Sequence, residues 1–471
     1  MDFATFYQLF LPLFSSFCYN GVMKKNDSIE LTIDDLGTDG QGIGHAEGLA
    51  VFVDGALPGE TVRAKVIALK KSYAVGKLDE VLVPSPMRTC PPCRVFGKCG
   101  GCTLQHLSYA AQLQFKQNHV QGCMQRIGKL DIPVNFPLPA RHEYRYRNKA
   151  AFPVRQDGEQ VDIGFYAAHS HRIVDVDDCK IEPSDFQIVM SQLRVWIVKN
   201  KIPVYDEKSH TGLLRHIVLR ENKAGEIMLV LCINGEDIPN RSHLIMLFEF
   251  VLPQVKSIML NCNTKRTNTI LGDRSICIYG KDHLFETLGG LEFKVGPNTF
   301  LQVNPAQTEA LYNTLFRMLA LTPSDTVLDL YCGVGTISLA AARRARRVIG
   351  IEIVGEAVEA AKFNAKLNDI ETAEFFAGDT AELLPSVLER ENVSAVIVDP
   401  PRKGLDEAVV RMLASSGVSR IGYVSCNPST LARDLALFKE LGYNAGIVQP
   451  VDMFPQTTHV ECVTVLSKAN G

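Results

Sequence analysis

A cysteine stands at the junction of two predicted elements near the C-terminus. The apolar run before Cys426 predicts a strand, and the segment from Ser429 to Leu441 predicts a helix. The N-terminus of a helix lowers the pKa of a nearby thiol, and the thiolate is the effective nucleophile. The pattern therefore predicts a nucleophilic Cys426, whereas the alternative for any single cysteine is a small buried apolar side chain.

An acidic residue follows an earlier apolar strand. The loop Asp399-Pro400-Pro401-Arg402-Lys403-Gly404 comes directly after the predicted strand Ala395 to Asp399. Two prolines stiffen the backbone, and a rigid loop suits the placement of a substrate base. An acid, two prolines and two cations together predict a functional loop rather than a simple connection.

A glycine-rich turn joins a third predicted strand, Thr326 to Tyr331, to a helix, Ile337 to Arg343. Its sequence is Asp329-Leu-Tyr-Cys-Gly333-Val-Gly335-Thr336. Glycines at this place in an open α/β sheet let a nucleotide approach the backbone. A dinucleotide site would carry another glycine at the position of Ser338 to accommodate the pyrophosphate. Its absence favours S-adenosylmethionine, which has no phosphate, and disfavours an NAD-dependent oxidoreductase.

The elements that must position these groups alternate between strand and helix from about residue 300. This alternation predicts a Rossmann-like, doubly wound α/β domain over residues 291–471. The next predicted strand, Val348 to Ile353, carries Glu352 near its end. That carboxylate could accept hydrogen bonds from both hydroxyls of a cofactor ribose, or it could be an ordinary solvated acid.

Four of the thirteen cysteines crowd together, at Cys90, Cys93, Cys99 and Cys102. Two Cys-x2-Cys pairs could hold zinc, although the five-residue gap between them is short for a zinc ribbon. Most of the others are scattered singly through apolar segments. Cysteines of that kind, such as Cys232, Cys262 and Cys277, are expected to be reduced core residues in a chain without a credible secretory signal.

Ahead of the cysteines, short alternating runs separated by Asp-Gly turns predict a five-stranded barrel of the oligonucleotide-binding type over residues 26–85. Between Glu60 and Leu69 one face is apolar, and the other carries Arg63 and Lys65. A basic face suits RNA, and a solvated barrel without a ligand is the alternative.

The region 86–290 is expected to be mixed α+β, with a helix from Ser108 to Gly128. At Arg141 to Arg155 it interleaves cations with aromatic residues. Cations attract phosphates and aromatic rings stack on unpaired bases, so this segment is a candidate RNA surface. An amphipathic strand with its aromatic residues in the core is the alternative.

Composition is typical of a soluble globular protein, with a formal net charge of -3 and 46% hydrophobic residues. The apolar stretch Phe6 to Phe17 is too short to span a bilayer, and Asp2 precedes it where a signal peptide would carry a positive charge. We expect residues 1–25 to be an extension, either disordered or the product of an upstream start before Met23. The protein is expected to be cytoplasmic, without a membrane or an obligate protein partner.

Four motifs occur in an order that resembles the RNA uracil-5-methyltransferase family, in particular its iron-sulfur branch that acts on bacterial 23S ribosomal RNA. They are Phe300-Leu-Gln302-Val-Asn304, Asp329-Leu-Tyr331-Cys-Gly333, Asp399-Pro-Pro-Arg402, and Ser425-Cys426-Asn427-Pro428 with the terminal His459-Val-Glu461. The resemblance extends from residue 28 onward, and its barrel is similar to the RNA-binding TRAM domain. One departure is Thr336, where the family often has asparagine.

The resemblance implies a role for each motif residue. Cys426 would be the nucleophile and Glu461 the base; the cofactor would be bound by Gln302, Tyr331, Glu352 and Asp399. A thiolate that adds to C6 of uracil makes C5 nucleophilic enough to take a methyl group, and a base then removes the C5 proton. Gln302 or Asp399 could also bind the uracil edge. The target base should be single-stranded or flipped out, because a paired base is inaccessible.

The resemblance also implies a [4Fe-4S] cluster on Cys93, Cys99, Cys102 and the distant Cys179, and zinc is the alternative. The expected role of the cluster is to stabilise the structure or to position the RNA. We therefore expect a 23S rRNA uracil-5-methyltransferase. Transfer-RNA methylation is less expected, because that branch typically lacks the barrel and the cluster. A non-catalytic RNA-binding protein is disfavoured by the intact Cys426 and Glu461.

Overall fold

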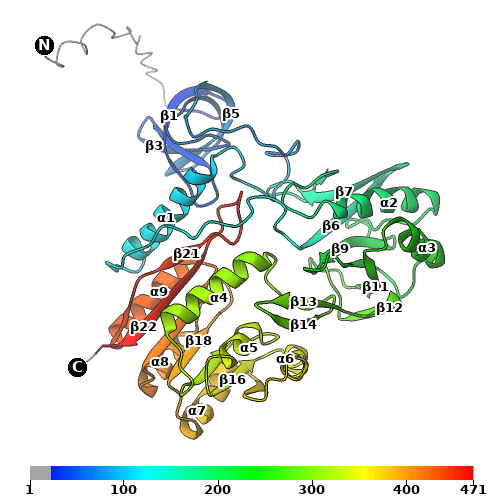
Figure 1. Ribbon diagram of the computed structural model, residues 1–471. Coiled ribbons are helices and arrows are strands. Elements are labelled where there is room, and N and C mark those ends of the chain that lie inside the picture. The colour runs from blue at the N-terminus through cyan, green and yellow to red at the C-terminus, as the bar shows by residue number, and fades with distance from the viewer. Residues whose placement is uncertain (1–22, 470–471) are drawn as a thin grey trace, which may run out of the picture. The chain divides into compact units, whose positions relative to one another are not determined.

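The computed structural model describes residues 23–469, and Figure 1 shows their secondary structure. These residues form two compact units. The first comprises residues 23–37 and 41–86, and the second comprises residues 38–40 and 87–469. Nearly all of the expected N-terminal extension lies outside the described residues. Its described end, Met23, is only 3% exposed and packs in the core of the first unit.

The first unit is a closed barrel, which confirms the five strands predicted there. Around the barrel the order is β1-β2-β3-β5-β4. The strands are β1 (Ser28–Leu36), β2 (Gly42–Ala46), β3 (Leu49–Asp54), β4 (Thr61–Leu69) and β5 (Tyr73–Val83). Val62, Ala64 and Val66 of β4 are fully buried, as their alternation predicts.

The opposite side of β4 is less basic than the sequence suggests. Arg63 makes ion pairs with Glu30 of β1 (2.7 Å) and Glu80 of β5 (2.6 Å), while Lys65 is exposed. Part of the predicted cationic face is therefore neutralised within the barrel itself.

The second unit begins with a helix and a seven-stranded sheet. Helix α1 (Tyr109–Arg126) lies within the predicted range, and the sheet has the order β12-β11-β10-β9-β6-β7-β8. Its strands are β6 (Lys149–Asp157), β7 (Gln160–Tyr166), β8 (Ile173–Asp175), β9 (Leu214–Glu221), β10 (Ile227–Ile233), β11 (Val255–Cys262) and β12 (Arg274–Gly280). Helices α2 (Asp185–Lys199) and α3 (Arg241–Val251) share one apolar core with this sheet.

The rest of the second unit is an eight-stranded sheet flanked by helices, after a hairpin of β13 (Leu284–Leu288) and β14 (Leu291–Val295) (Figure 1). The main path of the sheet is β17-β16-β15-β18-β19-β22-β20, with β21 paired to β22. Its strands are β15 (Thr326–Leu330), β16 (Arg347–Glu352), β17 (Ala373–Ala377), β18 (Ala395–Val398), β19 (Arg420–Ser425), β20 (Tyr443–Ala445), β21 (Gln449–Val451) and β22 (Glu461–Lys468). The helices are α4 (Pro305–Leu319), α5 (Thr336–Ala342), α6 (Gly355–Leu367), α7 (Thr380–Arg390), α8 (Glu407–Ser416) and α9 (Pro428–Glu440).

Both faces of this sheet are buried, which explains why its central strands are apolar at nearly every position. One core contains residues of α4, α5 and α6, and the other contains residues of α8 and α9 together with part of α1. Strand order reverses at β15, between β16 and β18. Open α/β sheets bind ligands at such a reversal, and the glycine-rich turn follows β15 directly. The predicted Rossmann-like α/β class is confirmed.

The twelve cysteines of the described chain are all free. Cys232 is buried as expected, but Cys262 is half-buried and Cys277 is exposed. Assigning Cys277 to the core was wrong, because its strand, β12, lies at the edge of the sheet.

None of the helices within residues 23–469 combines the length and the apolar character needed to cross a bilayer.

Replacement of Gly350, in the middle of β16, is expected to destabilise the protein. A Cβ at this position would lie 2.6 Å from the ring of Phe375 and 2.8 Å from Cys332 Sγ. We expect Gly350→Ala to lower the free energy of unfolding by about 1–3 kcal/mol through overpacking, measured by urea denaturation. Gly355→Ala is the control, because nothing lies within 4 Å of its Cβ position. Equal urea midpoints for the two variants would contradict this expectation.

Candidate active site

The thiol of Cys426 lies between the end of β19 and the start of α9. Asn427 caps this helix, since its side-chain oxygen accepts a hydrogen bond from the Ser429 N–H (3.0 Å). Pro428 occupies the start of the helix, where its missing N–H costs nothing. The predicted position of Cys426 at a strand-to-helix junction therefore agrees with the structure, in which the residue is half-buried.

The pKa of the Cys426 thiol is raised to about 11. Burial is the largest cause, and the carboxyl groups of Glu461 and Asp399 act in the same direction, while Arg402 lowers the pKa. The lowering expected from the helix N-terminus is thus outweighed in the free protein, because burial and negative charge both disfavour a thiolate. Sequence spacing alone could not show how many carboxyl groups surround the sulfur.

Glu461 is the carboxyl group that the sheet brings beside this thiol. Strand β22 runs antiparallel to β19 and pairs Cys462 with Ser425, so that Glu461 and Cys426 are neighbours at the end of the strand pair. Glu461 is 2% exposed, and burial together with Asp399 raises its pKa to about 8, opposed by Arg402. Its Oε2 atom has no hydrogen-bond partner among the described residues. A buried, unpartnered carboxyl oxygen is suited to accept a proton from a bound substrate.

The loop from Asp399 to Gly404 is held by α9, the helix that follows Cys426. Asn427 Nδ2 donates to the Arg402 carbonyl (3.2 Å), and Arg433 donates to the Lys403 carbonyl (2.9 Å). The rigidity that two prolines predict is thus reinforced from outside the loop. Asp399 itself is partly buried, and burial raises its pKa to about 7.

The glycine-rich turn leaves room for a ligand next to an anchored carboxylate. Gly333 has φ of +54°, and nothing lies within 4 Å of its Cβ position. Its N–H donates to Glu352 Oε2 (3.1 Å), and the Val354 N–H donates to Oε1 (2.9 Å). Each of these oxygens can accept further bonds. Open space above the turn and a fixed acceptor pair fit the ribose end of S-adenosylmethionine.

Ser338 explains why the turn lacks another glycine. Its hydroxyl donates to Asp329 Oδ2, and Asp329 Oδ1 has no partner among the described residues. Burial raises the pKa of Asp329 to about 7, and the charge of Asp399 adds to this effect. The hydroxyl of Ser338 therefore stabilises a buried acid. A dinucleotide site would have a glycine, without a side chain, at this position.

Two of the residues predicted to bind the cofactor, Tyr331 and Gln302, have weaker structural support than Glu352. Tyr331 is half-buried with φ of +65°, and burial raises its pKa to about 12. Gln302 is half-buried and lies three residues before the start of α4. None of the described hydrogen bonds connects its side chain to Cys426, Glu461 or Asp399.

Sequence reasoning missed Tyr312 of α4. Its buried hydroxyl forms a hydrogen bond with the Thr336 hydroxyl (2.8 Å), and its pKa is raised by burial and by the charges of three acids of the site. Those acids are Asp399, Asp329 and Glu461. On sequence alone Tyr312 is one apolar position of an amphipathic helix, so no signal separated it from the core. Thr336, which stands where the family often has asparagine, thus has a hydrogen-bond partner on another helix.

Four cysteines of the second unit interact with one another. Charge interactions link Cys99 with Cys93, and they link Cys102 and Cys179 with other members of the set, while burial raises the pKa of Cys99, Cys102 and Cys179. The Gly101 N–H donates to Cys99 Sγ (3.3 Å). Within residues 23–469 no three His, Cys, Asp or Glu side chains are arranged as ligands of a metal ion. In donor type and number, the four thiols fit a [4Fe-4S] cluster.

Arg145 secures the segment that carries Cys179. Its guanidinium donates to the carbonyls of Cys179 (2.7 Å) and Glu182 (2.8 Å) and forms an ion pair with Asp178 (2.6 Å). This role differs from the RNA contact that its sequence neighbourhood suggests.

Two aromatic residues of the segment from Arg141 to Arg155 are buried, whereas Arg155 is exposed. Phe152 is fully buried in the core, and Tyr146 is buried with its hydroxyl on the Pro455 carbonyl (3.0 Å). Arg155 forms an ion pair with Asp162. The core alternative is therefore correct for the aromatic residues Phe152 and Tyr146, of which only Phe152 lies in a strand, β6.

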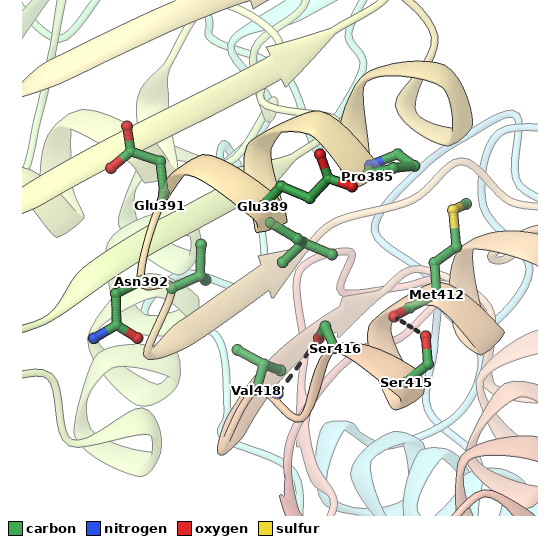
Figure 2. Close-up of a pocket in the computed structure, with 10 residues that line it drawn as sticks. Pro385, Glu389, Glu391, Asn392, Met412, Ser415, Ser416 and Val418 are labelled. Atoms are coloured by element: carbon green, nitrogen blue, oxygen red, sulfur yellow. Dashed lines mark hydrogen bonds between the residues drawn. The ribbon is translucent and has the colours of Figure 1, made fainter.

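A cavity of about 350 Å³ lies away from these groups (Figure 2). Its lining includes the ends of α7 and α8 and the residues that precede β18 and β19, such as Asn392 and Val418. It therefore lies at the amino edge of the parallel strands, whereas Asp399 and Cys426 follow their carboxyl ends. The cavity is not the site assembled by the motifs.

Comparison with known proteins agrees with this geometry. The family pattern described as tRNA (Uracil-5-)-methyltransferase matches residues 278–469, and the TRAM domain pattern matches residues 24–78. An uncharacterized RNA methyltransferase of Halalkalibacterium halodurans is 44% identical over 451 residues, which cover 95% of this chain and 98% of that protein. The chain belongs to the RNA uracil-5-methyltransferase family. A second member, from Clostridium acetobutylicum, is 43% identical over 453 residues, 95% of this chain and 98% of its own.

One solved structure of the RNA uracil-5-methyltransferase family matches over nearly the whole chain. It is the tRNA (uracil-54, C5)-methyltransferase of Pyrococcus abyssi in complex with S-adenosyl-L-homocysteine. The TM-score is 0.77 and the sequence identity is 29%. The match covers 93% of this chain and 99% of that chain. The resemblance to the family and the TRAM barrel are therefore confirmed, whereas the iron-sulfur branch stays a prediction.

The raised thiol pKa predicts slow alkylation of Cys426 at neutral pH. In the free protein we expect the rate with iodoacetamide to increase with pH up to about 11, because the thiolate is the reactive form. Glu461→Gln removes a negative charge and should accelerate alkylation at a given pH, whereas Arg402→Gln should slow it. Mass spectrometry of the peptide that contains Cys426 measures the rate. A plateau below pH 8 would contradict the raised pKa.

Proposed function

We propose that the protein methylates C5 of a uracil in RNA with S-adenosylmethionine as donor, through a covalent bond between Cys426 and C6. The observation that carries this proposal is the pairing of β19 with β22, which puts the buried carboxyl group of Glu461 beside the thiol of Cys426. A nucleophile and a base are both required, because C5 of uracil is unreactive until something adds to C6.

Each group has one task in this chemistry. The sulfur of Cys426 bonds to C6, and the electron pair of the C5=C6 bond moves toward C5. The bound donor would supply a methyl group on a positively charged sulfur: C5 bonds to the methyl carbon, the bond between that carbon and sulfur breaks, and a neutral thioether leaves. Glu461 then accepts the C5 proton, the double bond reforms, and the thiolate leaves C6. The raised pKa of Glu461 suits this task, since a base with a pKa near the working pH transfers protons well.

We assign Gln302, Tyr331, Glu352 and Asp399 to the cofactor. Support is strongest for Glu352, whose two oxygens are fixed by backbone N–H groups beside the open glycine turn. A negatively charged Asp399 would also attract the positively charged sulfur of the donor. Gln302 or Asp399 remains the candidate for binding the uracil edge.

For the RNA we propose bacterial 23S ribosomal RNA, modified in the cytoplasm. Transfer RNA is a second candidate, favoured by the tRNA methyltransferase of Pyrococcus abyssi. The match with that structure covers 93% of the 471 residues of this chain. The residues outside the match are too few to comprise the barrel, so the tRNA methyltransferase has a barrel as well. The presence of a barrel therefore does not argue against a tRNA substrate.

Release of tritium tests the reaction and the substrate together. The protein is incubated with S-adenosylmethionine and transcripts made with uracil tritiated at C5, either 23S rRNA or tRNA. We expect release of tritium to water from one transcript by the wild type and a loss of at least about 10³-fold in Cys426→Ala, because the nucleophile is removed. Mass mapping names the modified uridine. Undiminished methylation by Cys426→Ala would overturn the proposal, and a methylated tRNA alone would replace the rRNA assignment.

We further propose that Cys93, Cys99, Cys102 and Cys179 hold a [4Fe-4S] cluster. The mutual charge interactions of these thiols support the set, and Cys90 is left out of it because it is exposed. The role we assign to the cluster is structural.

Metal analysis separates the cluster from zinc. Anaerobic purification should give a brown protein with iron and sulfide in about equal amounts, as a four-thiolate cluster requires. Cys179→Ala should lose most of the iron, whereas Cys90→Ala should keep it. Stoichiometric zinc without iron would contradict the assignment.

A further inference from the structure

The segment that leads into Glu461 is anchored by side chains from distant parts of the second unit. This segment, residues 452–460, connects β21 to β22, and we name it the Glu461 loop. Asn304 Nδ2 donates to the Met453 carbonyl (3.0 Å), and Tyr146 donates to the Pro455 carbonyl (3.0 Å). Most of the loop is buried although it has no regular structure. Buried irregular backbone needs such partners, because each unpaired polar group would be costly.

The middle of the loop contains a strained residue. Gln456 is 1% exposed and has φ of +69°, in the left-handed region that a residue with a Cβ rarely adopts. Such a conformation is unfavourable and persists only where the surroundings enforce it. The contacts of Gln456 must therefore hold it in place.

Gln112 of α1 provides those contacts. Its side-chain amide makes a reciprocal pair with Gln456: Oε1 accepts from the Gln456 N–H (3.0 Å), and Nε2 donates to Gln456 Oε1 (3.0 Å). Nε2 also reaches the carbonyls of Leu104 (3.1 Å) and Leu107 (2.8 Å). The two hydrogens of Nε2 are shared among these three acceptors, so the side chain is well fixed, and its replacement by an apolar residue removes the partner of the buried Gln456 N–H.

The Gln456 carbonyl is bound as well, by the N–H groups of Thr103 and Leu104 (both 3.0 Å). A second anchor lies one turn along α1, where the fully buried Lys116 forms an ion pair with Asp452 (2.5 Å) and donates to the Phe454 carbonyl (3.0 Å). One face of α1 thus contacts the beginning and the middle of the Glu461 loop.

We propose that Gln112 is a positioning residue for Glu461: by enforcing the left-handed turn at Gln456, it sets the direction in which the chain enters β22. This inference rests on the proposed function of Glu461 as the base. Gln112 lies on another element and acts through the loop, so its loss should impair the step that needs Glu461 and spare the step that needs Cys426.

The two steps can be measured separately, because the methylated RNA stays bound to Cys426 until the C5 proton has been removed. A slower proton removal makes this covalent adduct accumulate as a shifted band on a denaturing gel. With the tritiated transcript that the wild type methylates, we expect Gln112→Met to lower kcat about tenfold, part of the contribution of a general base. The adduct fraction should increase several-fold, and KM for RNA should stay within about twofold. Glu461→Gln is the reference for full accumulation.

Two further variants complete the design. Gln114→Met changes an exposed glutamine of the same helix and should behave as the wild type. Gln456→Gly loses the side-chain bond to Gln112 Nε2 but keeps the N–H that Gln112 Oε1 binds, and it tolerates φ of +69° without strain, so it should fold even where Gln112→Met does not. Because a glycine also adopts many other backbone conformations, the turn is held less firmly, and this variant too should accumulate adduct.

The outcomes separate this inference from the function on which it rests. Folded Gln112→Met and Gln456→Gly proteins with the adduct fraction of the wild type would overturn the positioning role. If Gln112→Met fails to fold, Gln456→Gly decides alone by the same criterion. Methylation by Cys426→Ala, or a lack of adduct in Glu461→Gln, would instead overturn the proposed mechanism.

Discussion

Burial of acidic groups around one thiol is the constraint on which the candidate site depends. Asp329, Asp399 and Glu461 have pKa values raised to about 7, 7 and 8, with burial as the largest cause for each. Raised values mean that the fold disfavours the charged forms of these acids, which costs stability at a pH where they would otherwise be ionised. Groups of this kind concentrate at functional sites, where the chemistry needs them. The remainder of the domain supplies the rigid apolar frame that holds them together.

That frame brings the groups together through strand order. Parallel strands place Asp399, Glu352 and Cys426 at or just beyond the carboxyl edge of one sheet. The last strand runs in the opposite direction, so its first residue, Glu461, reaches the same edge. Helix α9 contributes twice, because its cap residue Asn427 follows the thiol and also binds the loop of Asp399. The thiol and the loop of Asp399 are therefore held at the same helix N-terminus.

The sequence predicted the elements and the local motifs well, because apolar periodicity and glycine turns are local signals. It could not predict what depends on antiparallel pairing or on burial. Glu461 looked like an ordinary strand-end acid until β22 was placed beside β19, and the pKa of Cys426 moved opposite to the helix-terminus expectation. Tyr146 and Phe152 were ambiguous for the same reason, since an aromatic residue beside cations suits either RNA or a core. The roles of Gln112 and Tyr312 depend on contacts between distant segments and left no pattern in the sequence.

The protonated thiol of the free protein is consistent with a nucleophile that is used only when both substrates are present. A thiol with a pKa of about 11 is almost entirely un-ionised at neutral pH and is therefore a poor target for oxidants and other electrophiles. A positive charge placed near Asp399 and Glu461 would offset the negative charges that raise this pKa, because opposite charges favour the ionised form. Arg402 already acts in that direction. In the proposed reaction the donor carries such a charge until the methyl group leaves, so the thiolate would be favoured during the steps that need it.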